Sequence, residues 1–221
     1  MMNAIASVND VSVKISGKLI LNHVSCSFLD KTMTVIYGSS GSGKTTLLNV
    51  LGGLESPTSG EVELFKQAVP KPNSKKANLF RRNQVSYLFQ NFALLDDQTI
   101  KRNLEVGLKY SGLTRKQREL KMCEALQRVN LPTQLLGAKI FSLSGGEKQR
   151  VALARVLLKP SRIIFADEPT GSLDPENRDT IIGILKAISK YKPVIIVSHD
   201  QAVIEAADVK INLASISNAP A

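Results

Sequence analysis

The chain has 221 residues, of which 43% are hydrophobic and 22% are charged. This composition supplies enough apolar side chains for a sizeable buried core, and it excludes collagen-like, low-complexity and wholly disordered proteins. The 29 Lys and Arg residues outnumber the 19 Asp and Glu residues, which gives a formal net charge of +10. This positive charge is consistent with an ordinary solvated surface, with binding to nucleic acid or with binding to the anionic face of a membrane, so it does not select a function.

The apolar runs of the chain, such as 162–166 and 193–198, are far shorter than the roughly 20 residues of a membrane-spanning helix. The N-terminus lacks the basic leader and the apolar stretch of a secretory signal, so we expect a cytosolic protein. Cys26 and Cys123 lie far apart without metal-ligand spacing and are expected to be free thiols.

Short apolar strands alternate with helical patterns, which predicts an α/β fold with a mainly parallel sheet. The first two strands are expected to form a hairpin around Ser16-Gly17-Lys18, and the third leads into a glycine-rich turn. The first part of the chain carries predicted strands at 5–15, 19–28, 32–37, 60–64 and 85–88, and a helix at 44–52.

From Thr99 to about Val129, apolar residues recur at helical spacing between charged ones, which predicts a helical insertion. The tail 214–221 has no periodicity and is expected to be frayed. We expect a single domain, with a core at about 1–90 and 144–213 and a helical subdomain at about 91–143. After the insertion, helices are predicted at 145–158 and 175–190, with a short one before the last strand, and strands at 163–166, 193–198 and 209–213.

The turn after the third strand reads GSSGSGKT, which fits the pattern GxxxxGK followed by Ser or Thr. In this strand–loop–helix context, the glycines let backbone N–H groups face phosphate oxygens, and the helix N-terminus adds positive potential. Lys44 is expected to reach the β and γ phosphates of a nucleotide, and the Thr45 hydroxyl to contact Mg²⁺. Residues 38–45 are called the phosphate loop below. The candidate phosphate-binding residues are Gly38, Ser39, Ser40, Gly41, Ser42, Gly43, Lys44, Thr45 and Thr46.

An apolar strand at 163–166 ends in two carboxylates, Asp167 and Glu168. A carboxylate at the carboxyl end of a parallel strand, beside a phosphate loop, is typical of a Mg²⁺ site, and Asp167 fits that role through water. Glu168 is expected to orient the attacking water or take its proton. Alone, the pair could equally cap the strand before Pro169; together with the phosphate loop it predicts an ATPase.

A second glycine-rich helix start reads Leu143-Ser-Gly-Gly-Glu147 and is called the signature motif below. Ser144 and Glu147 form a capping-box pattern, which explains those two residues structurally. It does not explain Gly145 and Gly146, because each glycine is unfavourable in a helix by about 1 kcal/mol relative to Ala. Close approach of the backbone to a ligand would explain them, so this motif predicts a second anion-binding helix start.

With these motifs in this order, the chain resembles the nucleotide-binding subunits of ATP-binding cassette (ABC) transporters over about residues 8–213. The resemblance implies a P-loop core of the RecA type with an N-terminal antiparallel β part and an inserted helical part. It also implies that Gln90 approaches Mg²⁺ and the attacking water, and that His199 contacts the γ phosphate. Ser172-Leu173-Asp174 is similar to the loop that crosses the dimer interface of the family.

The same resemblance implies a head-to-tail homodimer that forms on ATP. Each ATP would lie between the phosphate loop of one copy and the signature motif of the other. The chain departs from the family at Ile15, where an aromatic side chain usually stacks on adenine, so that base contact is expected to be apolar only. It also has Lys31-Thr32 where the family has Gly-Glu, and Glu147 where Gln is commonest.

The segments 88–95 and 166–174 are similar to the subfamily of macrolide-exporter, lipoprotein-release and bacteriocin-exporter ATPases. Its members work with a membrane permease, so we expect a separate permease that docks near Gln90–Asn103 at the inner face of the cell membrane. The expected substrate is a peptide, lipoprotein or antibiotic. No nucleic-acid partner is expected. The alternative is a soluble ABC ATPase acting on nucleic acid or ribosomes, although the long insertions of such proteins are missing; a kinase or GTPase would leave the signature motif unexplained.

Overall fold

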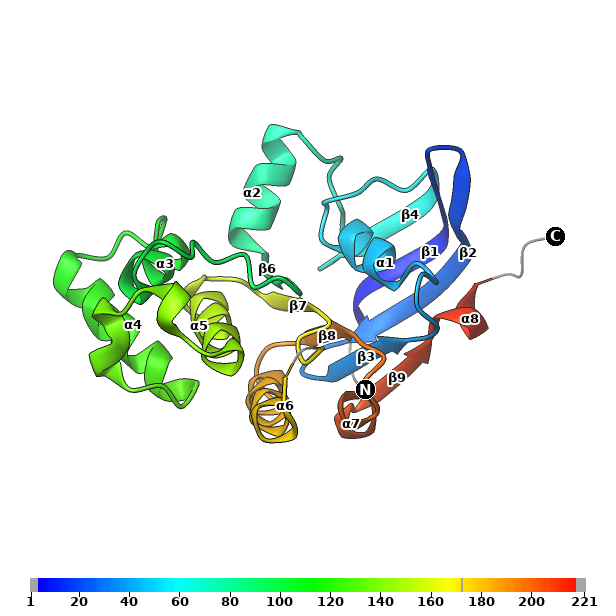
Figure 1. Cartoon of the computed structure of the whole chain (residues 1–221). Coiled ribbons are helices and arrows are strands. Elements are labelled where there is room, and N and C mark those ends of the chain that lie inside the picture. Colours follow the sequence, from blue (N-terminus) through cyan, green and yellow to red (C-terminus); the bar gives the residue numbers. More distant parts are fainter. Residues whose placement is uncertain (1–3, 172, 218–221) are drawn as a thin grey trace.

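The computed structural model describes residues 4–171 and 173–217 and contains two β-sheets with helices between and beside them (Figure 1). The first sheet is antiparallel, with strand order β2-β1-β4-β5. Its hairpin turns at Ser16 and Gly17, whose φ angles of 49° and 81° confirm the predicted turn. The strands are β1 (Ala4–Ile15), β2 (Lys18–Leu29), β4 (Ser59–Leu64) and β5 (Gln67–Ala68).

The second sheet is parallel, with strand order β6-β7-β8-β3-β9. Its central strands are buried on both faces: in β7, Ile164 and Ala166 join one core cluster, and Ile163 and Phe165 join the other. Burial on both faces is the reason that these strands read as continuous apolar runs in the sequence. The strands are β3 (Met33–Tyr37), β6 (Val85–Leu88), β7 (Ile163–Asp167), β8 (Val194–Val197) and β9 (Val209–Asn212).

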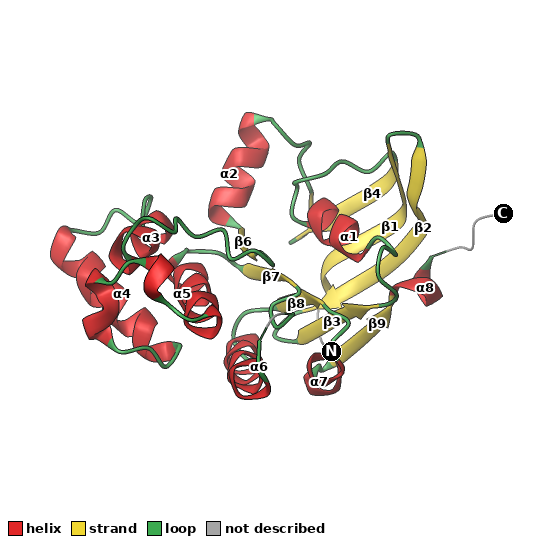
Figure 2. Ribbon diagram, in the orientation of Figure 1, coloured by secondary structure: helices red, strands yellow, loops and turns green. Residues whose placement is uncertain are grey.

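The helices cover this parallel sheet from both sides (Figure 2). Helix α1 packs between the two sheets, whereas α6 and α7 cover the opposite face of the parallel sheet. Helices α3, α4 and α5 form a helical body beside it. The helices are α1 (Lys44–Leu51), α2 (Lys75–Asn83), α3 (Ile100–Gly107), α4 (Arg115–Arg128), α5 (Gly145–Leu158), α6 (Pro175–Ser189), α7 (Gln201–Ala206) and α8 (Leu213–Ile216), with 3₁₀ turns at Thr133–Gly137 and Ile140–Ser142.

Two segments differ from the sequence-based predictions. Helix α2 was not predicted, because it is highly charged and buries only Ala77 fully; the Ser74 hydroxyl caps it, accepting from the Ala77 amide at 3.0 Å. The tail begins with a helix instead of a frayed segment, since Leu213 is buried and the Ser217 hydroxyl donates to the Asn22 carbonyl at 3.0 Å. The rest of the predicted tail, 218–221, lies outside the described residues. Across the described ranges, every helix is too short or too polar to cross a membrane.

Candidate functional site

The carboxyl ends of the parallel strands bring the predicted motifs to one edge of the sheet. The phosphate loop follows β3, Asp167 ends β7 and is followed by Glu168, and Ser198 and His199 follow β8. A cavity of about 400 Å³ opens there. Its lining joins nine predicted residues to one that was not predicted, Ile20; the nine are Ser40, Gly41, Gly43, Lys44, Thr45, Thr46, Gln90, Glu168 and His199. Gly38, Ser39 and Ser42 belong to the same loop but lie outside this lining.

The phosphate loop depends on glycine at the N-cap of α1. Gly43 has a left-handed φ of 98°, and a Cβ atom there would lie 2.8 Å from the Leu21 side chain, so a larger residue would strain the loop. The next residue, Lys44, is 7% exposed, and its ammonium donates to the carbonyls of Gly38 at 3.0 Å and Ser39 at 2.8 Å. The positive charge is thereby held against its own loop, at the helix terminus whose dipole also favours an anion.

An oxygen pair suited to a hard cation lies beside the lysine. The Thr45 hydroxyl donates to Asp167 Oδ1 at 3.1 Å. Burial raises the pKa of the Asp167 carboxyl, the Thr45 hydrogen bond opposes this, and the neighbouring Glu168 charge raises the pKa further. Hydroxyl and carboxylate oxygens fit Mg²⁺, which takes one or two protein ligands and completes its shell with water and phosphates. No group of three or more His, Cys, Asp or Glu side chains that could hold a metal occurs within 4–171 and 173–217.

Glu168 is held in a strained and well-defined position. Its φ of 44° is unusual for a residue with a side chain, and its amide donates to the Val197 carbonyl at 2.9 Å. Its carboxylate is 12% exposed and accepts from the Ser198 hydroxyl at 3.1 Å, while His199 Nδ1 lies 2.8 Å away. Against an ionised Glu168, Nδ1 carries the proton; in the neutral ring Nε2 is then an acceptor. His199 is 72% exposed, so it can face a ligand in the cavity.

Three residues of this region were not identified from the sequence. Ser198 could have been identified from the sequence, because it places a hydroxyl at the carboxyl end of a strand directly before His199. Gln149 could also have been identified, as a polar residue in the buried part of a helix; it is 1% exposed and donates to the Pro169 carbonyl at 2.6 Å, which ties α5 to the turn after β7. No feature of the sequence marks Ile20, because only the packing of β2 on the phosphate loop brings it to the cavity.

The signature motif lies at the start of α5 and does not line the cavity. Its capping box is complete: the Glu147 amide donates to Ser144 Oγ at 3.3 Å, and the Ser144 amide donates to Glu147 Oε2 at 2.8 Å. Hydrogen bonds from Ser144 lower the pKa of Glu147. The two glycines differ, since a Cβ on Gly145 would meet open space, whereas one on Gly146 would overlap the Asn177 side chain. Packing on α6 is therefore a further reason for glycine at position 146, and the contact of both glycines with a ligand stays a prediction.

Three further predicted residues, Asp167, Ile15 and Asp174, also lie outside the cavity lining. Ile15 ends β1 with 43% of its surface exposed. Asp174 is the N-cap of α6 and accepts from the Asn177 amide at 3.0 Å and its side-chain amide at 2.7 Å, bonds that lower the pKa of Asp174. Of the predicted interface loop, Ser172 lies outside the described residues.

A phosphate loop beside acidic residues at the ends of neighbouring parallel strands defines a P-loop nucleotide-binding domain, which confirms the predicted fold class. Residues 21–171 match the family model described as ABC transporter. The chain belongs to the ABC transporter family and is one of its ATP-binding cassettes.

Relatives and solved structures agree with this assignment. The chain is 38% identical over 197 residues to the macrolide export ATP-binding/permease protein MacB of Shigella flexneri, and 39% identical to MacB of Escherichia coli K12. Each match covers 88% of this chain but 30% of the relative, so the chain spans about a third of their length. The dimeric bacterial ABC transporter cassette MJ0796 superposes with a TM-score of 0.84 at 30% identity, covering 94% of both chains. Clostridium perfringens cbiO1, part of the transporter complex cbiONQ, has the same TM-score at 26% identity, covering 96% of this chain and 86% of its own.

Proposed function

We propose that this chain hydrolyses ATP as a head-to-tail homodimer and thereby drives a membrane permease. The observation that carries the proposal is the separation of two glycine-rich helix starts. One lies in a cavity with acid and base groups, whereas the signature motif does not line this cavity and has open space beside Gly145. A second copy would supply its signature motif to the first copy's ATP. The solved structures of MJ0796 support this, because one is a dimer and another is a dimeric post-hydrolysis state bound to ADP and Pi.

The residues around the cavity suit hydrolysis of a γ-phosphate by water. Lys44 and the amides of the phosphate loop bind the β and γ phosphates. Thr45, Asp167 and Gln90 would hold Mg²⁺, which offsets the negative charge of the phosphates when it is bound. Glu168 accepts a proton as the water oxygen attacks the γ-phosphorus and ADP leaves. His199 holds the Glu168 carboxylate through Nδ1, and its exposed ring lines the cavity, where it would contact the γ-phosphate.

The permease partner is inferred from the loop that follows β6. Arg155 of α5 donates to the carbonyls of Phe92 at 2.7 Å and Ala93 at 2.6 Å, and these two residues have positive φ angles of 61° and 47°. On the other side, the buried Asn103 accepts from the Leu95 amide at 2.8 Å. A partner seated near Gln90–Asn103 would therefore act on a constrained loop that begins at Gln90, in the ATP cavity.

The proposed substrate and location are inferred from the similarity to the MacB relatives. The MacB relatives are named as ATP-binding/permease proteins for macrolide export. We infer that the permease acts on an antibiotic, peptide or lipoprotein, and that the chain works at the inner face of the cell membrane. Co-purification with ribosomes or DNA in place of a membrane protein would favour the soluble alternative.

Replacing Glu168 with Gln tests the catalytic role directly. The variant should bind ATP but lose about 100-fold or more in turnover, close to 3 kcal/mol of barrier, because the proton acceptor is gone. It should also accumulate an ATP-bound dimer on size-exclusion chromatography. Glu63→Gln is a matched control, because it makes the same charge change on an exposed position of β4. Near-normal turnover of Glu168→Gln would contradict the role.

A further inference from the structure

The turn that follows Glu168 is held by a buried side chain of helix α5. Gln149, in the second turn of that helix, is 1% exposed, and its amide nitrogen donates to the Pro169 carbonyl at 2.6 Å. Pro169 directly follows Glu168 in the chain, so this bond fixes the peptide beside the proposed proton acceptor. Gln149 itself does not line the ATP cavity. It can therefore act on the reaction only through the position of the residues that it holds.

The surroundings of Gln149 would suit an apolar side chain. Residues 151–154, the next stretch of α5, are fully buried and apolar. The side-chain oxygen of Gln149 is buried too, and it has no hydrogen-bond partner within the parts of the chain that the structure describes. Burying an amide with one end unpaired costs free energy, a cost that an apolar side chain of the same size avoids. The bond to the Pro169 carbonyl is therefore what a glutamine supplies at this position and a Met or Leu would not.

Glu168 needs such support because its backbone is strained. Its φ of 44° lies in the left-handed region, which persists for a residue with a side chain only where the surroundings hold it. Its amide donates to the Val197 carbonyl at 2.9 Å, and the Thr170 hydroxyl donates to Asp200 Oδ2 at 2.9 Å. Both of these bonds run to β8 and to the residues that follow it. Gln149 adds a bond to a different element, so the turn is held between β8 and α5.

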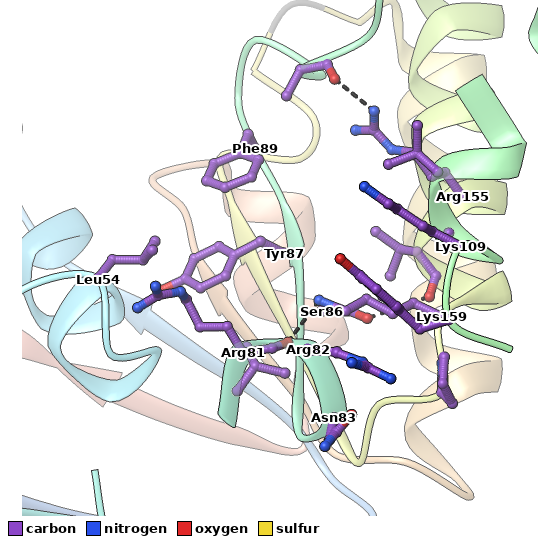
Figure 3. A pocket seen from close by; sticks show the side chains of 17 residues that line it. Leu54, Arg81, Arg82, Asn83, Ser86, Tyr87, Phe89, Lys109, Arg155 and Lys159 are labelled. Atoms are coloured by element: carbon purple, nitrogen blue, oxygen red, sulfur yellow. Dashed lines mark hydrogen bonds between the residues drawn. The ribbon is translucent and has the colours of Figure 1, made fainter. Parts of the chain in front are cut away.

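Helix α5 is a firm support for this bond. Beyond Gln149, its residues 151–154 are fully buried. Near its end, Arg155 donates to the Phe92 carbonyl at 2.7 Å and to the Ala93 carbonyl at 2.6 Å, beside a groove of about 440 Å³ (Figure 3). The helix is thus fixed by buried packing and by hydrogen bonds at its far end. Through Gln149, the turn after β7 is attached to a helix that has little freedom to move.

We propose that Gln149 is a positioning residue for ATP hydrolysis, which holds Glu168 through the Pro169 carbonyl at the place where it accepts a proton from the attacking water. This rests on the proposed function, in which Glu168 is that acceptor. The signature motif begins the same helix, but the bond from Gln149 runs to the turn beside the acid of its own copy. Loss of the bond should therefore slow the chemical step and leave ATP binding unchanged.

Replacing Gln149 with Met removes the donor at nearly constant volume. The kcat should fall about tenfold, because a small displacement of a reacting group is costly, whereas the affinity for ATP should stay within about twofold. The Tm should stay within about 3 °C of the wild-type value, since the unpaired oxygen is lost together with the bond. Gln149→Leu carries the same expectation and replaces Gln149→Met if that variant does not fold.

The matched control for this change is Ser189→Ala. The Ser189 side chain is also buried, at 2% exposed, and it donates to the Lys186 carbonyl at 2.9 Å at the end of α6. Its loss should leave kcat and ATP affinity unchanged. A wild-type kcat in Gln149→Met and Gln149→Leu, or weaker ATP binding with an unchanged kcat, would overturn the proposal. If Glu168→Gln is inactive at the same time, the proposed function stands.

Mixed dimers show which copy needs Gln149. A Lys44→Ala copy and a Gly145→Asp copy, whose added charge should repel the γ-phosphate, form one working ATP site. The Glu168 of that site belongs to the Gly145→Asp copy, and the signature motif belongs to the Lys44→Ala copy. Adding Gln149→Met to the Gly145→Asp copy should lower the recovered hydrolysis about tenfold, and adding it to the Lys44→Ala copy should leave it unchanged.

The other outcomes are equally informative. A loss only with Gln149→Met in the Lys44→Ala copy would mean that Gln149 serves the signature motif, and equal losses in both arrangements would mean a general effect on the fold. Either result overturns the proposal. If the parent mixture recovers no hydrolysis although mixed dimers form, the head-to-tail pairing of the proposed function is wrong, and the kcat of Gln149→Met in the unmixed chain decides on Gln149.

Discussion

Helices α1 and α5 begin with similar local chemistry but in different surroundings. Helix α1 follows the glycine-rich phosphate loop, and α5 carries Gly145 and Gly146 in its first turn. At α1, Lys44 is buried beside the Thr45–Asp167 pair, and Glu168 lines the same cavity. At α5, Ser144 and Gly145 are exposed, and the cavity lining contains no residue of the signature motif. An anion-binding helix start thus becomes a reaction centre only where acid and base groups are assembled around it.

The caps of the two helices explain part of this difference. The N-cap of α1 is Gly43, which makes no side-chain hydrogen bond to the helix, so the first amides are available to phosphate. The N-cap of α5 is Ser144, whose hydroxyl already accepts from the Glu147 amide. Helix α1 can therefore bind a phosphate chain within one copy of the protein. Helix α5 offers fewer free amides and is suited to closing over a nucleotide that is held elsewhere.

The strongest test of this comparison mixes two inactive variants. Lys44→Ala should abolish ATP binding at the phosphate loop. Gly145→Asp should keep the fold, because the position is open and an acid suits the first turn of a helix, but it should repel a γ-phosphate. In a mixed dimer, one of the two ATP sites combines an intact phosphate loop with an intact signature motif. Because about half of the dimers in an equimolar mixture are mixed, the mixture should regain about one quarter of wild-type ATP hydrolysis if the sites act independently.

The matched control mixes Lys44→Ala with Glu168→Gln. Both changes lie in the cavity at α1 of their own copy. Each of the two ATP sites in the mixed dimer therefore keeps one defect, and no activity should return. Fluorescence energy transfer between labelled variants shows whether mixed dimers form. Recovery in this control, or no recovery in the first mixture when mixed dimers are present, would contradict the assignment of the two helix starts to opposite copies.

A second test separates the two glycines of α5. Gly146→Ala should lower the free energy of unfolding by about 1–3 kcal/mol, because its Cβ would overlap Asn177. Gly145→Ala should change it by less than about 1 kcal/mol, or raise it slightly, since Ala favours the helix and meets open space. Urea denaturation measures both. Removing the obstacle in Gly146→Ala/Asn177→Ala should restore part of the loss; equal effects of the two single changes would be inconsistent with this packing.

The sequence predicted most of the sheet and both helix starts, because their signals are local. Strand β8 and residues 163–166 of β7 are apolar, since both faces are buried, and the phosphate loop is a contiguous motif. Helix α2 was missed because its position depends on distant contacts, such as the bond from Arg81 to the Gly53 carbonyl, and not on an apolar face. The reason for Gly146 was also inaccessible, because the residue that requires a glycine there, Asn177, comes from another helix.

A smaller effect is expected where the base of ATP would lie near α1. Ile15→Tyr should tighten ATP severalfold relative to ribose triphosphate if this position faces adenine, because an aromatic ring stacks on a base. The structure offers a rival in Ile20, which lines the cavity. Equilibrium binding of both ligands to Ile15→Tyr and Ile20→Ala distinguishes the two. No change for Ile15→Tyr, with weaker ATP binding for Ile20→Ala, would assign the apolar base contact to Ile20.

The smallest effects should have opposite signs at the two helix starts. The raised pKa of Asp167 means that the folded protein favours its protonated form, so its carboxylate costs stability above that pKa and the cost disappears as pH falls through it. Asp167→Asn should therefore raise the Tm of the nucleotide-free chain at neutral pH. The lowered pKa of Glu147 means that its carboxylate stabilises the fold at neutral pH, a contribution lost as pH falls through the lowered value.

Glu147→Gln should therefore lower the Tm at neutral pH. Both Tm differences from the wild-type chain are expected to be on the order of 1 °C at neutral pH. Both should become smaller as the pH is lowered toward about 4. Differential scanning calorimetry of the two variants and the wild-type chain, without nucleotide and at several pH values, measures them. Shifts of the same sign would mean that the two carboxylates lie in equivalent surroundings. Opposite signs would follow from the contrast between a carboxylate buried beside a phosphate loop and one that completes a helix cap.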